Sequence, residues 1–448
     1  MTVLLVTTLA MVGVLIVAHF GGTLGASIVV LLFTLSAYPK TLTSVAGSPI
    51  PHVGIAAATP SLTTYSLALV VIIVGLFLRH GIPRSLWLWA PFSLWCCVAL
   101  TTGWWPNTDE AWAGIFQLAL APLAWWVGCE AATGARNQPR IARVVVYAIL
   151  AILIIQLAVA SLQASGIAIN PMPPANEALL GNRSNGTLSH PNDLGKIVLL
   201  LTAVSLPLFA DRDGIRVSRR FFLLLILSFA ILVLTGGRAV LIGSAATIIL
   251  WFLLQPNTRA GMNRKFVVIG FSSVGALLVW MALAARFDED PTGGARNQLS
   301  ALALQQISMR PFIGTGPNSY VSIVGQFDPL TASGVPVHSS FLLAAAELGI
   351  PGAIAFALPF AVAVLRALRK TPGRTSVSAW SRSLIAVIPA CVLIGATGWG
   401  LLGSYVLPLL SFMFGWLAFG EDHLVGRRLP HHSGPRATRH FVSRSRGL

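Results

Sequence analysis

The stretch VVVYAILAILIIQLAVASLQASG (residues 144–166) contains no charged side chain and consists mostly of apolar residues. A helix needs about 17–25 such residues to cross the hydrocarbon core of a bilayer, and this stretch falls within that range. It therefore predicts a membrane-spanning helix and raises the question of how many similar stretches the chain holds.

Apolar runs recur along the whole chain. Of its 448 residues, 55% are hydrophobic and 10% are charged, whereas charged residues make up about a quarter of a soluble domain. We therefore predict an all-α, polytopic transmembrane helical protein of about 12–13 spans, with a transmembrane domain over residues 1–420. The count depends on the short run 24–38 and on the run 405–420, which contains Pro408. The expected spans are 3–18, 24–38, 61–78, 85–102, 111–131, 144–166, 191–210, 221–235, 238–255, 266–285, 339–368, 384–403 and 405–420.

The basic residues predict the orientation of these spans. Most of the 30 Lys and Arg residues fall in alternate connections and in the tail, which marks that side as cytoplasmic. The net charge of +16 then follows from topology and from attraction to anionic membrane lipids, so no nucleic-acid partner is indicated. The tail 421–448 is basic and rich in Pro, Gly and Ser, and we expect it to be disordered on the cytoplasmic side. The remaining basic residues lie on the outer side: Lys40, Arg183, Lys196, Arg238, Arg286, Arg296 and Arg310.

Two outer connections are too long to be simple turns. They cover residues 166–190 and 286–337, and a loop of more than about 15 residues in a compact protein is usually functional. The second contains RNQLSALALQQISMRPF (residues 296–312), whose apolar residues follow a helical period. We expect an amphipathic helix that lies against the outer membrane surface. Its apolar residues are Leu299, Leu302, Ala303, Ile307 and Phe312.

The four cysteines indicate neither disulfide bonds nor a metal site. Cys96, Cys97, Cys129 and Cys391 all lie inside or at the end of apolar runs. Their spacing matches no metal-binding motif. We interpret them as small buried apolar residues.

Several motifs together resemble the signature of the O-antigen ligase and O-antigen polymerase superfamily. SMRPFIGTGPNSY (residues 308–320) is followed by VHSSFLLAAAELGIPGAI (residues 337–354), which places a histidine before an apolar helix and Glu-x-Gly-x-x-Gly. NRSNGTLSHPNDLG (residues 182–195) and LTGGRA (residues 234–239) are similar to two further pieces of the family pattern. Ser339 stands where the family usually has Asn, and Gly237 where it usually has Ser.

This resemblance implies an enzyme, a glycosyltransferase of the cell envelope that acts in polysaccharide biosynthesis. Family members transfer a glycan from an undecaprenyl-diphosphate-type donor to an acceptor hydroxyl at the outer face of the cytoplasmic membrane, without a metal ion or other cofactor. We expect metal-independent, inverting transfer from a polyprenyl-diphosphate-linked donor. The acceptor is a second repeat unit in a polymerase and a separate anchored glycan or lipid in a ligase, and both remain open.

The site residues follow from this chemistry. His338 is the expected catalytic base, because a histidine titrates near neutral pH; an interfacial anchor is its alternative role. The resemblance assigns Arg296 to the substrate diphosphate, which a guanidinium can grip in a bidentate fork; a solvated helix face is its alternative role. Arg238 lies in a Gly-Gly hairpin on the outer side, where orientation does not explain a basic residue, so we expect it to bind the diphosphate as well; a snorkelling residue at the membrane end is its alternative role. Gly314 and Gly316 permit a turn, and Glu347 caps or pairs near the break at residues 349–352. Further possible substrate-binding residues are Arg183, His190, Arg310 and Arg286.

Two functions of other classes remain open. A membrane transporter would also have about twelve spans, with charged residues at midplane and internal repeats. A lipid-linked glycan flippase or carrier-binding protein would keep the arginines without needing His338. Loss of transfer with retained donor binding after His338→Ala separates an enzyme from both.

Overall fold

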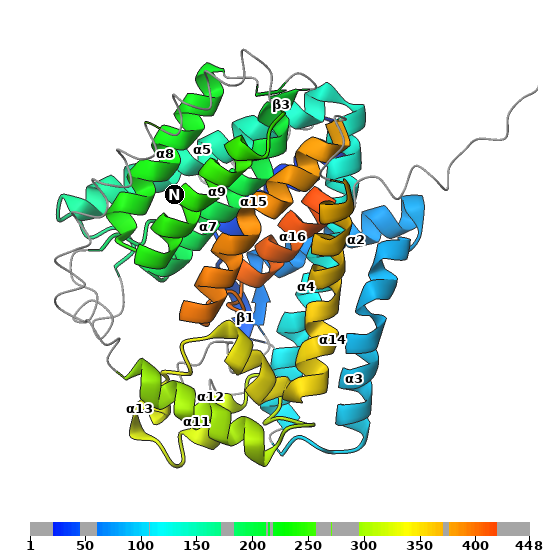
Figure 1. Cartoon of the computed structure of the whole chain (residues 1–448), viewed down its shortest axis with the longest axis vertical. Helices are drawn as coiled ribbons and strands as arrows, with labels where there is room; N and C mark the ends of the chain where they lie inside the picture. The colour runs from blue at the N-terminus through cyan, green and yellow to red at the C-terminus, as the bar shows by residue number, and fades with distance from the viewer. Residues whose placement is uncertain are drawn as a thin grey trace, which may run out of the picture.

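The computed structural model describes residues 21–44, 61–106, 108–171, 183–211, 214–215, 218–256, 270, 295–370 and 376–418. Within these ranges the chain is almost entirely helical (Figure 1). Its strands form two short antiparallel hairpins, β1 (Thr41–Ser44) with β2 (Ser61–Thr63), and β3 (Ala210–Asp211) with β4 (Gly214–Ile215). The expected all-α, polytopic fold is confirmed.

The helices follow the apolar runs closely. The opening stretch of the sequence analysis lies in α5 (Pro139–Ala164), which starts with Pro at its first position, where a missing backbone N–H costs nothing. The remaining bounds are Gly21–Ser36, α2 Thr64–His80, a 3-10 helix Arg84–Trp89, α3 Ala90–Thr101, α4 Thr108–Asn137, α7 Pro191–Ser205, a 3-10 helix Leu206–Phe209, α8 Arg219–Thr235, α9 Arg238–Leu253, α11 Arg296–Met309, α12 Tyr320–Val324, α13 Pro329–Ala332, α14 Ser340–Lys370, α15 Ser376–Thr397 and α16 Val406–Ala418.

Five of the described helices are long and apolar enough to cross a membrane. They are α4, α5, α7 with its 3-10 extension, α14 and α15. The expected total of about 12–13 spans stays a prediction, because the runs 3–18 and 266–285 lie outside the described residues. The tail 421–448 and the boundary of the transmembrane domain at residue 420 lie outside them as well.

The centre of the bundle is the short helix α16. All of its 13 residues are buried, and at 1.5 Å per residue it is about 20 Å long, shorter than the roughly 30 Å hydrocarbon core. It packs against α4 with backbone contact: a Cβ on Gly415 would lie 2.2 Å from the Trp125 carbonyl oxygen, and one on Gly128 would lie 2.2 Å from that of Phe412. Small residues that allow such close approach are typical of helix packing in membranes.

Both boundaries of the expected span 384–403 are wrong. The helix α15 starts at Ser376 and ends at Thr397, and the chain then turns through Gly398, Gly400 and Gly403. The segment is apolar enough to look like a span, yet three glycines in six residues disfavour a helix. This turn instead becomes part of the site described below.

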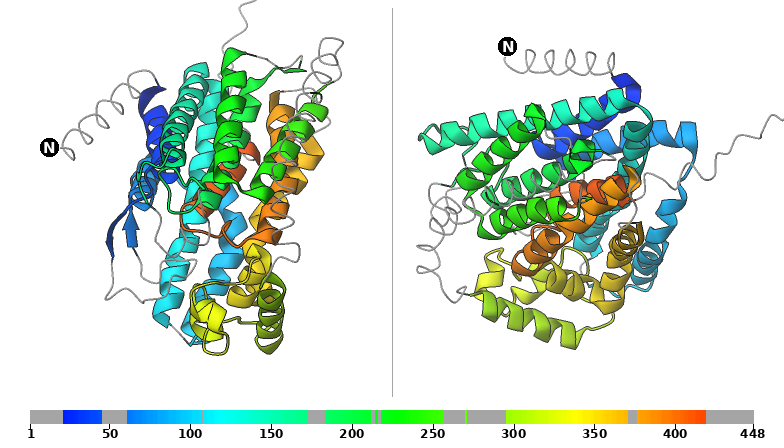
Figure 2. Two further views of the ribbon diagram at one scale, coloured as in Figure 1. Left: turned by 90° about the vertical axis from the view of Figure 1, so that its left-hand side faces the viewer. Right: turned by 45° about the horizontal axis from the view of Figure 1, so that its top comes forward.

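Helices α11, α12 and α13 gather at one end of the bundle, and we call residues 296–332 the lid (Figures 1 and 2). The helix α11 starts at Arg296 as expected and buries Leu299 and Ala303. It ends at Met309, however, so the expectation that Phe312 belongs to its apolar face is wrong. The chain turns after Arg310, and Phe312 is 70% exposed.

Candidate functional site

His338 lies two residues before α14, in a segment fixed by hydrogen bonds. The Ser339 hydroxyl accepts from the backbone N–H of Leu342 at 3.3 Å, which caps the helix. The Ser340 hydroxyl donates to the Gly398 carbonyl oxygen at 2.8 Å, in the turn after α15. Ser is among the preferred N-cap residues, so Ser339 suits this position.

The environment of His338 favours the neutral imidazole. Burial lowers the pKa of His338 most, and the positive charge of nearby Arg296 lowers it further, while the Pro336 carbonyl acts in the opposite direction. Nδ1 of His338 is buried and has no hydrogen-bond partner of normal geometry among the described residues. A neutral imidazole has one unprotonated ring nitrogen, which can accept a proton from an incoming hydroxyl group.

Arg296 and Arg310 lie at opposite ends of α11. The helix has 14 residues, so the two Cα atoms are about 20 Å apart at 1.5 Å per residue. Arg296 is exposed and lies within electrostatic range of His338. Arg310 follows the last turn of α11, where its carbonyl oxygen accepts from the backbone N–H of Gly314. One diphosphate therefore cannot contact both arginines if the lid keeps this form.

The lid is docked onto a break in α14. Gly349 interrupts the helix with a φ of 70°, and the exposed backbone groups bond to residues 311–316. Thr315 N–H donates to Ala346 O at 2.9 Å, Gly316 N–H to Glu347 O at 2.8 Å, and Ile350 N–H to Pro311 O at 2.7 Å. These bonds hold the lid at a set position relative to the start of α14 and His338.

The roles expected for Glu347 and the two glycines agree with this geometry. The Glu347 carboxylate accepts from the backbone N–H of Tyr320 at 3.4 Å, at the start of α12. Gly314 and Gly316 both have a positive φ, 64° and 102°, which a turn residue without a side chain adopts at little cost. Glu347 is thus a capping residue between α14 and the lid.

Arg183 joins the two other motif segments. Its Nε donates to the Thr235 carbonyl oxygen at 2.6 Å, and its Nη2 donates to the Asn192 side chain. Thr235 ends α8, Gly236 closes that helix in the left-handed conformation, and Arg238 begins α9. Arg183 therefore positions the short hairpin that presents Arg238, and two of its five N–H donors are committed to that contact.

His190 has a structural role in the same cluster. It is the N-cap of α7, and its Nδ1 accepts from the backbone N–H of Asn192 at 3.0 Å. Burial lowers the pKa of His190 most, Arg183 and Lys196 lower it further, and Asp193 raises it. The ring is therefore held neutral, and its Nε2 keeps the proton that could be donated to a ligand.

Sequence reasoning missed a polar chain at the start of α7. Lys196 is 7% exposed and pairs with Asp193 at 2.8 Å. The Tyr405 hydroxyl donates to the other oxygen of Asp193 at 3.0 Å and lies 3.0 Å from the Ser189 hydroxyl. Asp193 and Lys196 one turn apart in an apolar run were the available signal, but nothing in the sequence linked them to Tyr405.

Two glutamines of α5 hold the loop before His190. Gln156 accepts from the Thr187 backbone N–H at 3.0 Å and donates to the Thr187 hydroxyl at 2.7 Å. Gln163 accepts from the backbone N–H groups of Asn185 and Gly186 at 3.1 and 2.8 Å. A polar residue repeated at i and i+7 in an apolar helix lies on one face, so this pair could have been found in the sequence.

The structure thus forms two clusters at one end of the bundle. One contains His338 and Arg296, and the other contains Arg183, His190 and the hairpin of Arg238. The turn after α15 lies between them, because Gly398 accepts from Ser340 while Gly400 packs against the ammonium group of Lys196. Arg286 lies outside the described residues.

Comparison with known proteins agrees with the motif resemblance. Residues 223–357 match the family model described as O-antigen ligase. This range includes His338, Arg238 and Arg296, and it begins after the cluster residues Arg183 and His190. No curated protein matches the chain.

Proposed function

Because this chain carries a domain of the O-antigen ligase and polymerase superfamily, we propose that it transfers a glycan from a polyprenyl-diphosphate-linked donor to an acceptor hydroxyl. We place the reaction at the outer face of the cytoplasmic membrane, because the distribution of basic residues predicts that the lid and both clusters are on that side. The product is a polymerised surface polysaccharide or a glycan ligated to an anchored acceptor.

His338 is the proposed general base. The observation that carries this role is the position of His338 just before α14, where burial and the charge of Arg296 lower its pKa and favour the neutral imidazole. The acceptor hydroxyl approaches this ring, and its proton moves to the imidazole as its oxygen forms a bond to the anomeric carbon. General-base assistance of this kind contributes roughly a hundredfold to ten-thousandfold in rate.

Arg296 and Arg238 are proposed to stabilise the leaving group. As the new bond forms, the bond from the anomeric carbon to the diphosphate oxygen breaks and its electron pair leaves with the diphosphate. Guanidinium groups at that oxygen supply positive charge where negative charge develops, so the proposal involves no metal cofactor. Attack from the face opposite the diphosphate inverts the anomeric configuration.

His338→Ala tests the enzymatic role against a flippase or carrier-binding role. The purified full chain in nanodiscs should lose glycan transfer by about a hundredfold or more, while donor binding and thermal stability stay close to wild type. Transfer at the wild-type rate by this variant, or a product with the donor's anomeric configuration, contradicts the mechanism. A wild-type chain that binds the donor without transferring glycan, with donor binding unchanged in His338→Ala, favours the carrier-binding role.

The acceptor separates polymerase from ligase. Mass spectrometry of surface glycans from a deletion strain shows single-repeat glycans if a polymerase is lost. It shows unmodified acceptor if a ligase is lost. Complementation with wild type and with His338→Ala connects either phenotype to this site.

A further inference from the structure

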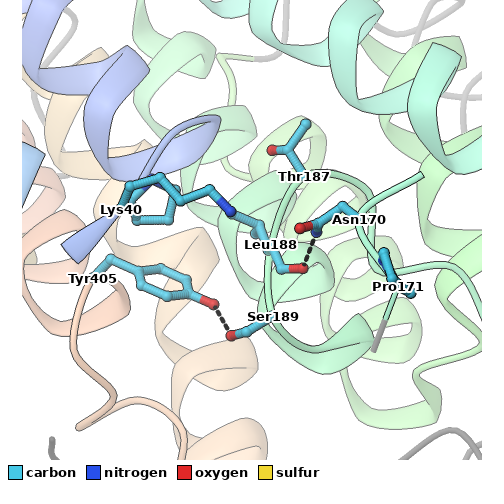
Figure 3. A pocket seen from close by; sticks show the side chains of 8 residues that line it. Lys40, Asn170, Pro171, Thr187, Leu188, Ser189 and Tyr405 are labelled. Carbon is cyan, nitrogen blue, oxygen red and sulfur yellow. Dashed lines mark hydrogen bonds between the residues drawn. The ribbon is translucent and has the colours of Figure 1, made fainter. Parts of the chain in front are cut away.

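A pocket of about 170 Å³ with several polar lining residues lies beside the second cluster (Figure 3). Figure 3 shows Lys40 and Tyr405 on one side of it and Asn170 and Pro171 on the other, with the loop of Leu188 and Ser189 between them. The loop is the one that ends at the cap residue His190. The lining residues are Pro39, Lys40, Asn170, Pro171, Thr187, Leu188, Ser189 and Tyr405.

The wall of this pocket is held in place before any ligand binds. Asn170 donates to the Leu188 carbonyl oxygen at 2.8 Å, and Gln156 donates to the Thr187 hydroxyl at 2.7 Å. A Cβ on Gly186, whose φ is 61°, would lie 2.2 Å from the Gln156 side-chain oxygen, so the loop can pack this closely only with glycine there. A preformed wall loses little conformational entropy on binding.

The hydroxyl groups of the wall can pair with a sugar. A hydroxyl has one donor and two acceptor positions. Thr187 accepts from Gln156, which leaves its own proton to donate. Because Tyr405 donates to Asp193, the Ser189 hydroxyl donates to Tyr405 and keeps acceptor positions for a ligand. The wall therefore offers both a donor and an acceptor to a ligand that itself carries hydroxyl groups.

Lys40 adds a positive charge to this site. Its backbone is anchored at the start of α2, where its N–H donates to the Thr64 hydroxyl at 3.2 Å and its carbonyl oxygen accepts from Thr64 N–H at 2.9 Å. The nearest acidic residue of the polar chain, Asp193, is already paired with Lys196 at 2.8 Å. Among the described residues, the pocket therefore carries a net positive charge, which favours an anionic ligand.

We infer that this pocket binds one acidic sugar of the glycan, with Lys40 at the carboxylate and Thr187 and Ser189 at the hydroxyl groups. This inference rests on the proposed function, because it names the class of glycan that the site accepts. The pocket adjoins the hairpin of Arg238 through Ser189, His190 and Asn192, so a bound sugar lies next to the proposed diphosphate site.

Direct binding tests the inference without turnover. Methyl glucuronoside, methyl galacturonoside and methyl glucoside are titrated into the full-length chain in nanodiscs and followed by saturation-transfer NMR. We expect at least one uronoside to bind about tenfold more tightly than the glucoside, since a hydrogen bond to a charged group is stronger than one to a neutral group. Lys40→Gln should remove this preference, and Lys40→Arg should keep it.

Arg84→Gln is the matched control. Arg84 is exposed and lies before the start of α3. The chain just after the end of α3 contacts the lid, where the Trp105 indole N–H donates to the Ile313 carbonyl oxygen. Arg84 therefore lies at the end of the bundle away from the lid and the pocket. The Arg84→Gln substitution removes one positive charge, as Lys40→Gln does, and should leave sugar binding unchanged. Equal binding of all three sugars overturns the inference, as does equal loss in the Lys40→Gln and Arg84→Gln variants.

Titration with inorganic phosphate tests whether the pocket recognises a phosphate group instead of a sugar carboxylate. If phosphate alone displaces the uronoside and binds as tightly, the pocket is a phosphate site and the acidic-sugar assignment is wrong. His338→Ala should bind the uronoside like wild type. Failure of the sugar assignment is thus separate from failure of the proposed catalysis, which the His338→Ala transfer rate reports.

Discussion

Gly314→Ala should release the lid while the bundle stays folded. Gly314 has a φ of 64°, and a Cβ there would lie 2.3 Å from the Glu347 carbonyl oxygen and 2.5 Å from the Gly349 nitrogen. Both atoms belong to the backbone of the break in α14, so neither can rotate away. The loop must therefore move off α14 to make room for the methyl group.

The cost can be worked from the contacts that are lost. A non-glycine residue in the left-handed region costs about 1–2 kcal/mol. Three hydrogen bonds join the loop to α14, from Thr315, Gly316 and Ile350, and each contributes about 0.5–1.5 kcal/mol net. Together these give about 3–6 kcal/mol, which corresponds to a hundredfold to ten-thousandfold increase in the population of the undocked lid.

Hydrogen exchange measures this population directly. The backbone N–H groups of Thr315, Gly316 and Ile350 should exchange faster by that factor, and glycan transfer should fall because Arg296 no longer lies beside His338. Gly75→Ala is the control, because a Cβ there meets nothing within 4 Å. Exchange at those three groups that is the same in Gly314→Ala and Gly75→Ala refutes the reasoning.

Three further predictions concern charge and topology. The transfer rate should rise with pH through one ionisation below pH 6.5, because burial and Arg296 lower the pKa of His338 and its neutral form is the active base. Arg296→Gln removes the charge that disfavours the imidazolium, so the midpoint should move to higher pH; an unmoved midpoint in the pH–rate profile contradicts this. Arg238→Lys and Arg296→Lys should each transfer glycan much more slowly than wild type, since lysine lacks the planar fork. Wild-type turnover of both lysine variants would contradict the diphosphate role. Reporter fusions at Arg140, Arg216, Arg264 and Arg374 should read cytoplasmic and those at Asn176 and Asp328 external, and an external signal from two of the first four overturns the orientation.

Membrane insertion and the start of the lid helix could be predicted from local sequence. The bilayer core is a uniform apolar solvent, so any long uncharged run has one favourable environment, as residues 144–166 illustrate. Arg296 could be placed at the start of α11 because a helical period in the apolar residues is a local property of the chain. His338 was selected by its motif, and its position just before α14 follows from the apolar run after it.

Contacts between polar groups that are far apart in the sequence could not be predicted from local sequence. Tyr405 meets Asp193 across 212 residues of chain, and Arg183 meets the end of α8 across 52. Such contacts depend on how the helices pack against each other. Packing in turn depends on the shapes of the helix surfaces; for example, the missing side chain of Gly415 lets α16 approach α4 closely. The separation of Arg310 from Arg296 is different, because it follows from the length of the single helix α11.

The sequence by itself therefore determined the apolar helices and the start of the lid helix, because these depend on composition and short-range periodicity. The residue types that suit glycan transfer were indicated by the resemblance of the motifs to a known family. The tertiary structure alone decided that Arg296 lies near His338, that Arg183 positions the hairpin of Arg238, and that Lys40 and Tyr405 line one pocket together with Ser189. Those pairings join distant segments, and they form only when close packing of the helices makes one arrangement more stable than the others.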